Sequence, residues 1–307
     1  MKNTINFYYN IFLDEFIKKD NCYYFYYGGD EYYFVPLNRP YDDVQSIYKL
    51  NLEMKKRRCL VHELVLNKDK SIITIVNGIS YVLIKLCKYK NDKVFLNDIN
   101  YIQNMTVNIE CDKSLVRNDW IKLWSEKIDY YEYQISQVGK KYPLLCDSLS
   151  YFIGMGENAI SYLVNNLDSK TNVNLVVSHK RIYQESGSLN FYDPLNFVVD
   201  SRVRDVAEFI KETFYNKTLN LYDLKSYFNM ANLNKNEYIL LLGRLLFPTY
   251  YFDIYDDIIN KGKSEELVIN IIDRTDEYES LLNTIYKFIL YEKKARLEPI
   301  EWLQDKN

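Results

Sequence analysis

The first third of the chain carries apolar residues in short alternating or continuous runs bounded by turn residues, a pattern typical of strands. Gly28-Gly29-Asp30 and Asn77-Gly78 lie between such runs and predict tight hairpins, because these residues adopt a positive φ at low cost. One helix is expected between the second and third runs, with acidic residues in its first turn and four cations in its last. The expected strands are residues 22–27, 31–37, 60–66, 71–76 and 80–87, and the expected helix is 41–57.

From about residue 98 the apolar positions change to a spacing of three to four residues, which predicts helices. The clearest series starts at Ser114 and runs to Val138, and Gly139 then supplies a helix end. A second helix is expected over residues 147–167. Four more are expected near residues 220–230, 235–247, 250–260 and 264–291.

Residues 174–209 interrupt the helical series and hold most of the candidate chemistry. A short buried strand is expected over Asn174–Val177, and a polar loop with His179 and Arg181 follows it. A second short strand is expected to end at Tyr192. The pattern therefore predicts two strands that flank a histidine loop.

Asp193-Pro194 is expected to break the second strand, and a helix is expected to open near Asp200 or Ser201, either of which suits its N-cap. This order is the layout of a kinase-type phosphotransfer centre. There a loop Asp orients the acceptor hydroxyl, while a loop Asn and the Asp after the second strand hold magnesium. The sequence thus predicts an α+β, bilobal, protein-kinase-like fold, with a small lobe over residues 1–88 and a large, mainly helical lobe over 89–307.

Charge and cysteine content exclude several classes of protein. The 307 residues carry a net charge of −3, so no basic excess displaces counterions from nucleic acid, and we expect no nucleic-acid partner. Five scattered cysteines include no C-x-x-C pair, so neither a zinc site nor a disulfide framework is indicated. No apolar run approaches the roughly 18 residues that span a bilayer. We expect synthesis in the cytoplasm without a signal peptide, and no membrane insertion.

Tyrosine is unusually abundant, with 31 residues. An AT-rich coding sequence would explain this abundance together with that of Asn, Lys and Ile. A role for tyrosine in adhesion or cross-linking is the alternative. Both explanations stay open on the sequence.

Five segments of the predicted large lobe carry motifs of a known family: residues 120–129, 156–160, 202–210, 243–252 and 300–303. They resemble the spore-coat proteins of the CotS and YutH type, found in spore-forming Firmicutes. The resemblance covers most of the predicted large lobe in the right order, and the H-x-R loop favours the YutH type. It implies a fold similar to that of aminoglycoside and choline phosphotransferases.

Carried over residue by residue, the resemblance implies a loss of chemistry. Active relatives read H-x-D in the loop, whereas this chain reads His179-Lys180-Arg181, so a guanidinium stands in place of the orienting carboxylate. The magnesium-binding Asn has no counterpart in residues 184–188. The phosphate-binding Lys is missing where the strand reads Tyr33-Phe34-Val35-Pro36. Asp193 alone survives, as the candidate for the magnesium-binding Asp.

Each residue of this group also has a structural interpretation. His179 is expected to be a packed, hydrogen-bonded scaffold residue rather than a catalytic one. Asp205, on the following helix, is expected to accept hydrogen bonds from the backbone of the histidine loop. Asp193 either caps the Pro194 turn or binds metal. Glu53, without a lysine to pair with, is expected on a solvated helix face.

The sequence therefore predicts a vestigial active-site cleft of His179, Arg181, Asp193 and Asp205, with no catalytic, cofactor-binding or metal-binding residue. Arg181 is expected to pair with Asp193 or to bind an anion there, with no metal present. The predicted function is that of a catalytically inactive structural or interaction component of the spore coat or its assembly. Other spore-coat proteins are the expected partners.

Two alternatives remain. One is a divergent small-molecule phosphotransferase that uses ATP and has rebuilt its site from Asp193, His179 and a lysine such as Lys85. The other is a sensor that binds a nucleotide or metabolite in the cleft without chemistry.

Overall fold

The computed structural model describes residues 1–168 and 173–304, which divide into two compact units. Unit 1 comprises Met1–Arg117 and Leu175–Asp200, and unit 2 comprises Asn118–Asn174 and Ser201–Asn307. The segment with the histidine loop therefore belongs to the same unit as the N-terminal strands. The lobe boundary near residue 88 stays a prediction.

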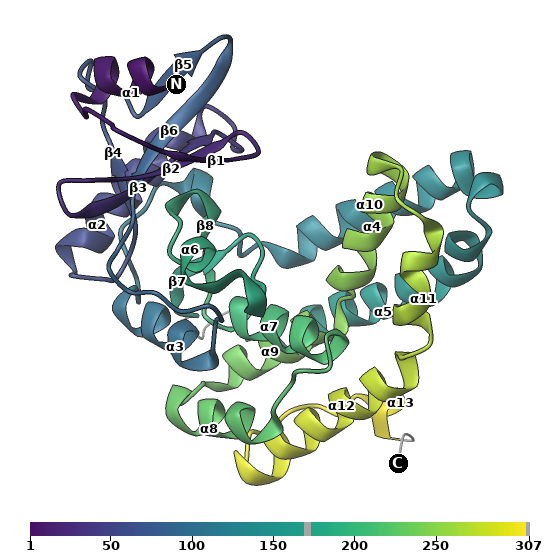
Figure 1. Ribbon diagram of the computed structural model, residues 1–307. Helices are drawn as coiled ribbons and strands as arrows, with labels where there is room; N and C mark the ends of the chain where they lie inside the picture. The colour runs from purple at the N-terminus through teal and green to yellow at the C-terminus, as the bar shows by residue number, and fades with distance from the viewer. Residues whose placement is uncertain (169–172, 305–307) are drawn as a thin grey trace. The chain divides into compact units, whose positions relative to one another are not determined.

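Unit 1 is built on a six-stranded antiparallel sheet with the order β1-β2-β3-β6-β4, in which β5 also pairs with β6 (Figure 1). All five predicted strands are present. The additional strand β1 escaped prediction because its three residues are all exposed and give no apolar pattern. The strands are β1 Ile17–Lys19, β2 Cys22–Tyr27, β3 Asp30–Pro36, β4 Glu63–Val65, β5 Ile73–Val76 and β6 Ile79–Lys85.

Both predicted hairpins are confirmed. Gly28 and Gly29 have φ of 60° and 82°, and Asn77 and Gly78 have φ of 51° and 79°. These are the left-handed values that two-residue turns between antiparallel strands require.

Helices and a second, two-stranded sheet complete unit 1. The helix α2 is the predicted one, shortened by two residues at its start and one at its end, whereas α1 and α3 were not predicted. The small sheet pairs β7 with β8, and three short helical segments lie between these two strands in the sequence. The helices are α1 Lys2–Tyr9, α2 Asp43–Lys56, α3 Leu96–Met105 and η1 Lys113–Leu115. The later elements are β7 Leu175–His179, η3 Gln184–Ser186, α6 Gly187–Phe191, η4 Pro194–Asn196 and β8 Phe197–Ser201.

The prediction of a strand ending at Tyr192 is wrong, because this segment forms the short helix α6. Gly187 starts the helix with φ of 60°, and a Cβ there would lie 2.6 Å from the carbonyl oxygen of Asn91. The backbone N–H of Ser188 donates to that oxygen at 2.8 Å, and its hydroxyl accepts from the N–H of Asn91 at 3.0 Å. A contact with a distant part of the chain thus overrides the local apolar pattern.

Apart from Ser201, the last residue of β8, the described residues of unit 2 form helices and the loops between them (Figure 1). The series expected from Ser114 starts as a helix at residue 120, and the helix expected over 264–291 is divided into four pieces. The helix expected near residues 200–201 starts at residue 203, since β8 continues through Ser201. The long helices are α4 Trp120–Val138, α5 Pro143–Asn166, α7 Val203–Tyr215, α8 Leu221–Ala231, α9 Lys235–Leu246, α10 Thr249–Lys261 and α12 Thr275–Lys287. Shorter pieces are η2 Gly139–Lys141, η5 Glu265–Val268, α11 Ile269–Ile272, the π-helix η6 Phe288–Glu292 and α13 Glu301–Gln304.

The core of unit 2 is formed by the segments that carry the family resemblance. The ring of Trp124 stacks on Phe247 with centroids 4.3 Å apart. A Cβ at Gly156 would lie 3.0 Å from Ile128, and a Cβ at Gly243 would lie 2.4 Å from a methyl group of Leu163. These motifs therefore encode close helix packing.

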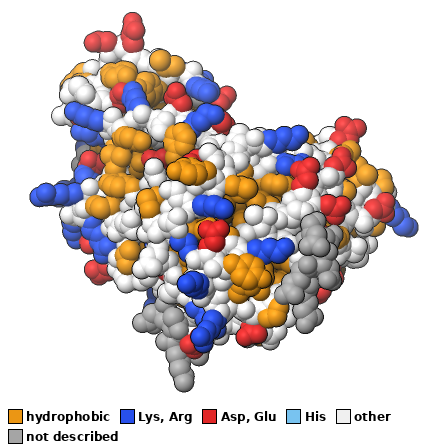
Figure 2. Space-filling view, turned by 90° about the horizontal axis from the view of Figure 1, so that it is seen from below, with side chains coloured by type: hydrophobic (Ala, Val, Ile, Leu, Met, Phe, Trp, Pro, Cys, Tyr) orange, Lys and Arg blue, Asp and Glu red, His pale blue; other side chains and the backbone are white. Residues whose placement is uncertain are grey.

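The surface is of mixed character. On the face drawn in Figure 2, basic and acidic side chains lie interspersed among apolar ones. Within residues 1–168 and 173–304, no helix is long and apolar enough to cross a membrane.

Candidate functional site

His179 is the last residue of β7 and is only 2% exposed. Its Nε2 lies 2.8 Å from the carbonyl oxygen of Phe191, and its ring stacks on that of Phe191 with centroids 4.4 Å apart. Phe197 packs edge-on against the same imidazole. The predicted packed and hydrogen-bonded state of His179 is confirmed, and β7, α6 and β8 are joined through it.

Asp193 precedes β8 rather than following the second strand, because that strand starts at Phe197. Its carboxylate accepts a hydrogen bond from the N–H of Leu195 at 2.9 Å and so caps the Pro194 turn. Burial raises the pKa of Asp193 to about 6, although the Leu195 N–H and the charges of Lys180 and nearby basic groups act to lower it. Asp193 is thus a half-buried capping residue.

Asp200 occupies the place that the kinase layout gives to the metal-binding Asp, at the end of the second strand of this sheet. It lies in β8, one residue before the strand ends, and is fully buried. From the sequence, Asp200 is expected only as a possible N-cap of the following helix. The signal that identifies it is the apolar run Phe197-Val198-Val199 directly before it, which forms the buried strand.

Arg181 lies in the loop after β7. Its guanidinium group donates to the carbonyl oxygen of Lys180 at 2.8 Å, and the amide of Asn196 donates to the carbonyl of Arg181 at 3.0 Å. These contacts fix the loop against the turn before β8. The pairing of Arg181 with Asp193 stays a prediction.

Arg39 is a residue of this region that sequence reasoning missed. It lies in the loop after β3, and its side chain is 1% exposed. The guanidinium group donates to the carbonyl oxygens of Leu195 at 3.2 Å and Phe197 at 2.5 Å, and pairs with the carboxylate of Asp43 at 3.2 Å. A lone arginine before a proline gives no pattern from which this role could be predicted.

Asp205 is 2% exposed and lies in the first turn of α7, in unit 2. Its predicted hydrogen bonds to the histidine loop stay a prediction.

Further along α7, the charged side chains of Glu208 and Lys211 join a buried network with Arg244. The carboxylate of Glu208 accepts from the Nζ of Lys211 at 2.9 Å and from the Nε of Arg244 at 2.8 Å.

Lys211 is enclosed by acceptors. Its Nζ also donates to the carbonyl oxygens of Arg244 and Phe247, at the end of α9, and to the hydroxyl of Thr249 at 2.6 Å. Burial lowers the pKa of Lys211 to about 8, against the attraction of Glu208. The network ties α7 to the end of α9 and the start of α10.

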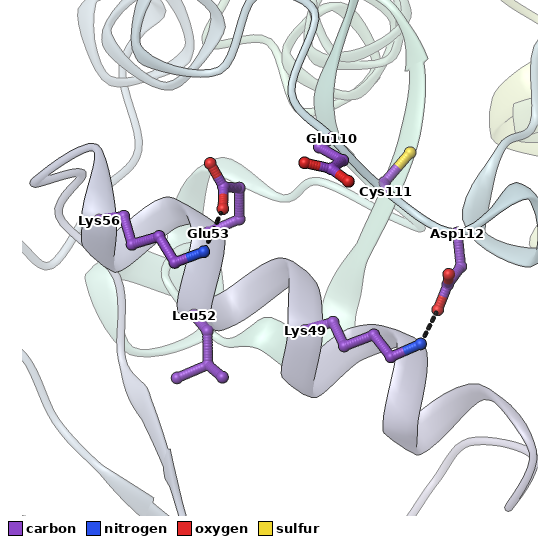
Figure 3. Close-up of a pocket in the computed structure, with 7 residues that line it drawn as sticks. All are labelled: Lys49, Leu52, Glu53, Lys56, Glu110, Cys111 and Asp112. Carbon is purple, nitrogen blue, oxygen red and sulfur yellow. Dashed lines mark hydrogen bonds and ion pairs between the residues drawn. The ribbon is translucent and has the colours of Figure 1, made fainter.

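Glu53 is less exposed than expected. It lies on α2, pairs with Lys56 at 2.9 Å and lines a pocket of about 250 Å³ between α2 and residues 110–112 (Figure 3). In this pocket Lys49 pairs with Asp112 at 3.2 Å (Figure 3). Lys85, the lysine of the rival phosphotransferase interpretation, pairs with Asp30 at 2.5 Å.

Across the part of the chain that the structure describes, no group of three His, Cys, Asp or Glu side chains is arranged to hold a metal ion. The arrangement around β7 and β8 is instead one of capped turns and buried hydrogen bonds.

Comparison with known sequences identifies the family. The sequence matches the family described as spore coat putative kinase YutH over residues 2–285. The chain belongs to this family. The endospore coat-associated protein YutH of Bacillus subtilis (strain 168) is 30% identical over 207 residues, which cover 60% of this chain. The match spans 61% of that relative. The resemblance inferred from the sequence motifs is confirmed.

Solved structures confirm the predicted fold, which is α+β and similar to aminoglycoside phosphotransferases. The structure of an aminoglycoside phosphotransferase from Alicyclobacillus acidocaldarius superposes with a TM-score of 0.65, covering 94% of this chain and 96% of that one, at 9% identity. Spectinomycin phosphotransferase superposes with a TM-score of 0.59, covering 86% and 89% of the two chains, also at 9% identity. Identities this low establish the fold alone.

Proposed function

We propose that this protein is a component of the bacterial spore coat that has kept a kinase-like fold without phosphotransfer chemistry. The observation that carries the proposal is Arg181, which stands in the loop where the kinase layout places its hydroxyl-orienting Asp. A guanidinium does not release its proton near neutral pH, so it can neither orient nor deprotonate an acceptor hydroxyl. Membership of a spore-coat family supports the location.

The donor set is a poor match for a magnesium–nucleotide centre. Asp200 stands at the position that the kinase layout gives to the metal-binding Asp, whereas Asp193 caps the turn before β8. The loop between Gln184 and Ser188 lacks the second magnesium ligand, an Asn. Without positioning and charge neutralisation, little of the catalysis of phosphoryl transfer remains.

The protein would be synthesised in the cytoplasm and assembled onto the spore with other spore-coat proteins as its partners. Membership of the spore-coat family and the similarity to an endospore coat-associated protein support this assignment. His179, Arg181 and Asp193 would then be remnants of a phosphotransfer site that now maintain the fold of unit 1.

Asp200 supports a second candidate, a divergent small-molecule phosphotransferase that uses ATP. It is a buried carboxylate at the end of β8, the place of the metal-binding Asp in the kinase layout.

An assay for ADP formation from ATP and magnesium tests both proposals, with the Asp200→Asn variant as the matched control. The proposed coat function predicts no ADP above the level of the variant. Magnesium-dependent ADP formation that the variant loses would overturn the proposal in favour of the phosphotransferase.

A further inference from the structure

The pocket of about 250 Å³ beside α2 is built from two walls, both within unit 1 (Figure 3). One wall is a single face of α2, because residues three to four positions apart lie on the same side of a helix. This face contributes Lys49, Leu52, Glu53 and Lys56. The other wall is formed by residues 110–112, in the segment that follows α3.

The lining of the pocket has more carboxylates than cations. Lys49 pairs with Asp112 on the opposite wall at 3.2 Å, and Lys56 pairs with Glu53 at 2.9 Å (Figure 3). These two pairs use both lysines. The third carboxylate, that of Glu110, is exposed and forms no hydrogen bond or ion pair within residues 1–168 and 173–304. Two lysines against three carboxylates leave one negative charge.

Arg57, at the end of α2, does not neutralise this charge. Its Nε lies 4.0 Å from the carboxylate of Glu53, at the limit of an ion pair. Its guanidinium group donates instead to the carbonyl oxygens of Val107 at 2.9 Å and Asn108 at 3.4 Å. The negative charge of Glu110 is therefore available to a ligand.

Charge and size together indicate the class of ligand. An exposed carboxylate accepts charge-assisted hydrogen bonds from an ammonium group. Leu52, which is 39% exposed, and the half-buried Cys111 add apolar surface on which an alkyl chain can pack. Pockets for drug-sized ligands measure about 300–1,000 Å³, so this pocket has room for a smaller molecule or a single side chain.

We propose that this pocket binds a primary ammonium group on a short alkyl chain, either a free amine or the side chain of a lysine on another protein. Glu110 would accept hydrogen bonds from the ammonium group, and Leu52 would contact the alkyl chain. This inference goes beyond the proposed coat function, because it assigns a ligand to residues outside the loop of His179 and Arg181. It holds whether or not the protein transfers phosphate.

The test is a ligand-observed NMR titration of the whole protein with pentylammonium chloride at constant ionic strength. We expect saturable binding. 1-Pentanol lacks the charge and ammonium chloride lacks the chain, so each should bind about tenfold more weakly or less. A short peptide with one lysine, compared with the same peptide carrying norleucine, distinguishes the two sources of the ligand. Binding of the lysine peptide would identify a protein side chain, and binding of pentylammonium alone would identify a free amine.

Three variants connect the binding to the pocket. Glu110→Gln should weaken pentylammonium binding about fivefold or more, since it removes the charged acceptor. Glu15→Gln is the matched control, because Glu15 is exposed between α1 and β1 and does not line the pocket. Lys56→Gln should instead strengthen binding about threefold, because it releases Glu53 from its ion pair.

The opposite signs expected for Glu110→Gln and Lys56→Gln separate a binding role from a loss of folding, which would weaken binding in both variants. Absence of saturable pentylammonium binding would overturn the proposal. So would pentanol binding as tightly as pentylammonium, or equal affinity in the Glu110→Gln and Glu15→Gln variants.

Discussion

Lys211 in unit 2 and Lys180 in unit 1 have the same lowered pKa, about 8, but lie in different surroundings. Burial is the largest cause of the lowered pKa for both. Lys211 is fully enclosed and donates to four protein acceptors, including the carboxylate of Glu208. Lys180 is half-buried, and two neighbouring arginines push its pKa down further. The first environment is a buried hydrogen-bond network between helices, and the second is a partly exposed loop after β7.

The comparison explains why the motifs that identify the family lie in the packed core of unit 2. Glu208, Arg244 and Thr249 lie in or beside the motifs that carry the resemblance, and they form one buried network. A buried charge without its partner is costly, so such residues resist substitution. Substitution in the loop after β7 carries no comparable cost in folding free energy. In this loop Arg181 stands where the kinase layout has the orienting carboxylate.

The largest effect is expected from Glu208→Gln. This change removes the carboxylate that the buried cations Lys211 and Arg244 both contact, and should lower the free energy of unfolding by about 3–5 kcal/mol. Glu53→Gln is the control, since its partner Lys56 is 74% exposed and the pair should contribute about 1 kcal/mol or less. Urea unfolding of both variants measures the difference. Equal effects would contradict the distinction between the scaffold and an exposed pair.

Gly243→Ala should have the next largest effect. The new Cβ would lie 2.4 Å from a methyl group of Leu163, so the helices α5 and α9 would have to separate. Overpacking of this severity costs about 3 kcal/mol. Gly154→Ala, on α5 with no atom within 4 Å of its new Cβ, should instead stabilise by about 0.5–1 kcal/mol. Chemical unfolding that gives both variants the same sign would refute this packing argument.

His62 provides a pH-dependent test in unit 1. Its Nδ1 accepts from the N–H of Cys87 at 3.1 Å and its Nε2 lies 3.0 Å from the carbonyl oxygen of Leu189, which together fix a neutral tautomer. Burial lowers the pKa of His62 to about 4.

Because the folded pKa lies below the unfolded value of about 6.5, the stabilisation is complete above pH 6.5 and is lost as the pH falls. About 2 kcal/mol should disappear between pH 6.5 and pH 5. His62→Gln, which cannot titrate, should show a smaller loss in urea unfolding at these two pH values. An unchanged slope in the variant would show that other groups cause the acid sensitivity.

The sequence predicts those parts of the fold that local chemistry specifies. The pairs Gly28-Gly29 and Asn77-Gly78 predict their hairpins correctly, because few other residues adopt the positive φ that these turns require. The helix α2 follows from its apolar spacing and its charged ends. The prediction of a strand ending at Tyr192 was wrong because Gly187 and Ser188 contact Asn91, almost a hundred residues away in the sequence.

The candidate site is predicted less completely. His179 and the H-x-R loop were identified from the sequence because a motif marks them. The Asp at the end of the second strand was assigned to Asp193, since the wrong strand shifted the expected position by seven residues from Asp200. No sequence pattern predicted the role of Arg39. Its hydrogen bonds go to the carbonyl groups of Leu195 and Phe197, which only the folded chain brings near it.

The measurement that tests the central claim most directly is a melting series with ATP, with and without magnesium. A ligand at a hundred times its dissociation constant stabilises a protein by about 2.7 kcal/mol. We predict no magnesium-dependent rise in melting temperature, because Arg181 stands in place of the orienting carboxylate and residues 184–188 lack the second magnesium ligand. A saturable rise that appears only when magnesium accompanies ATP would contradict the account and favour an active phosphotransferase.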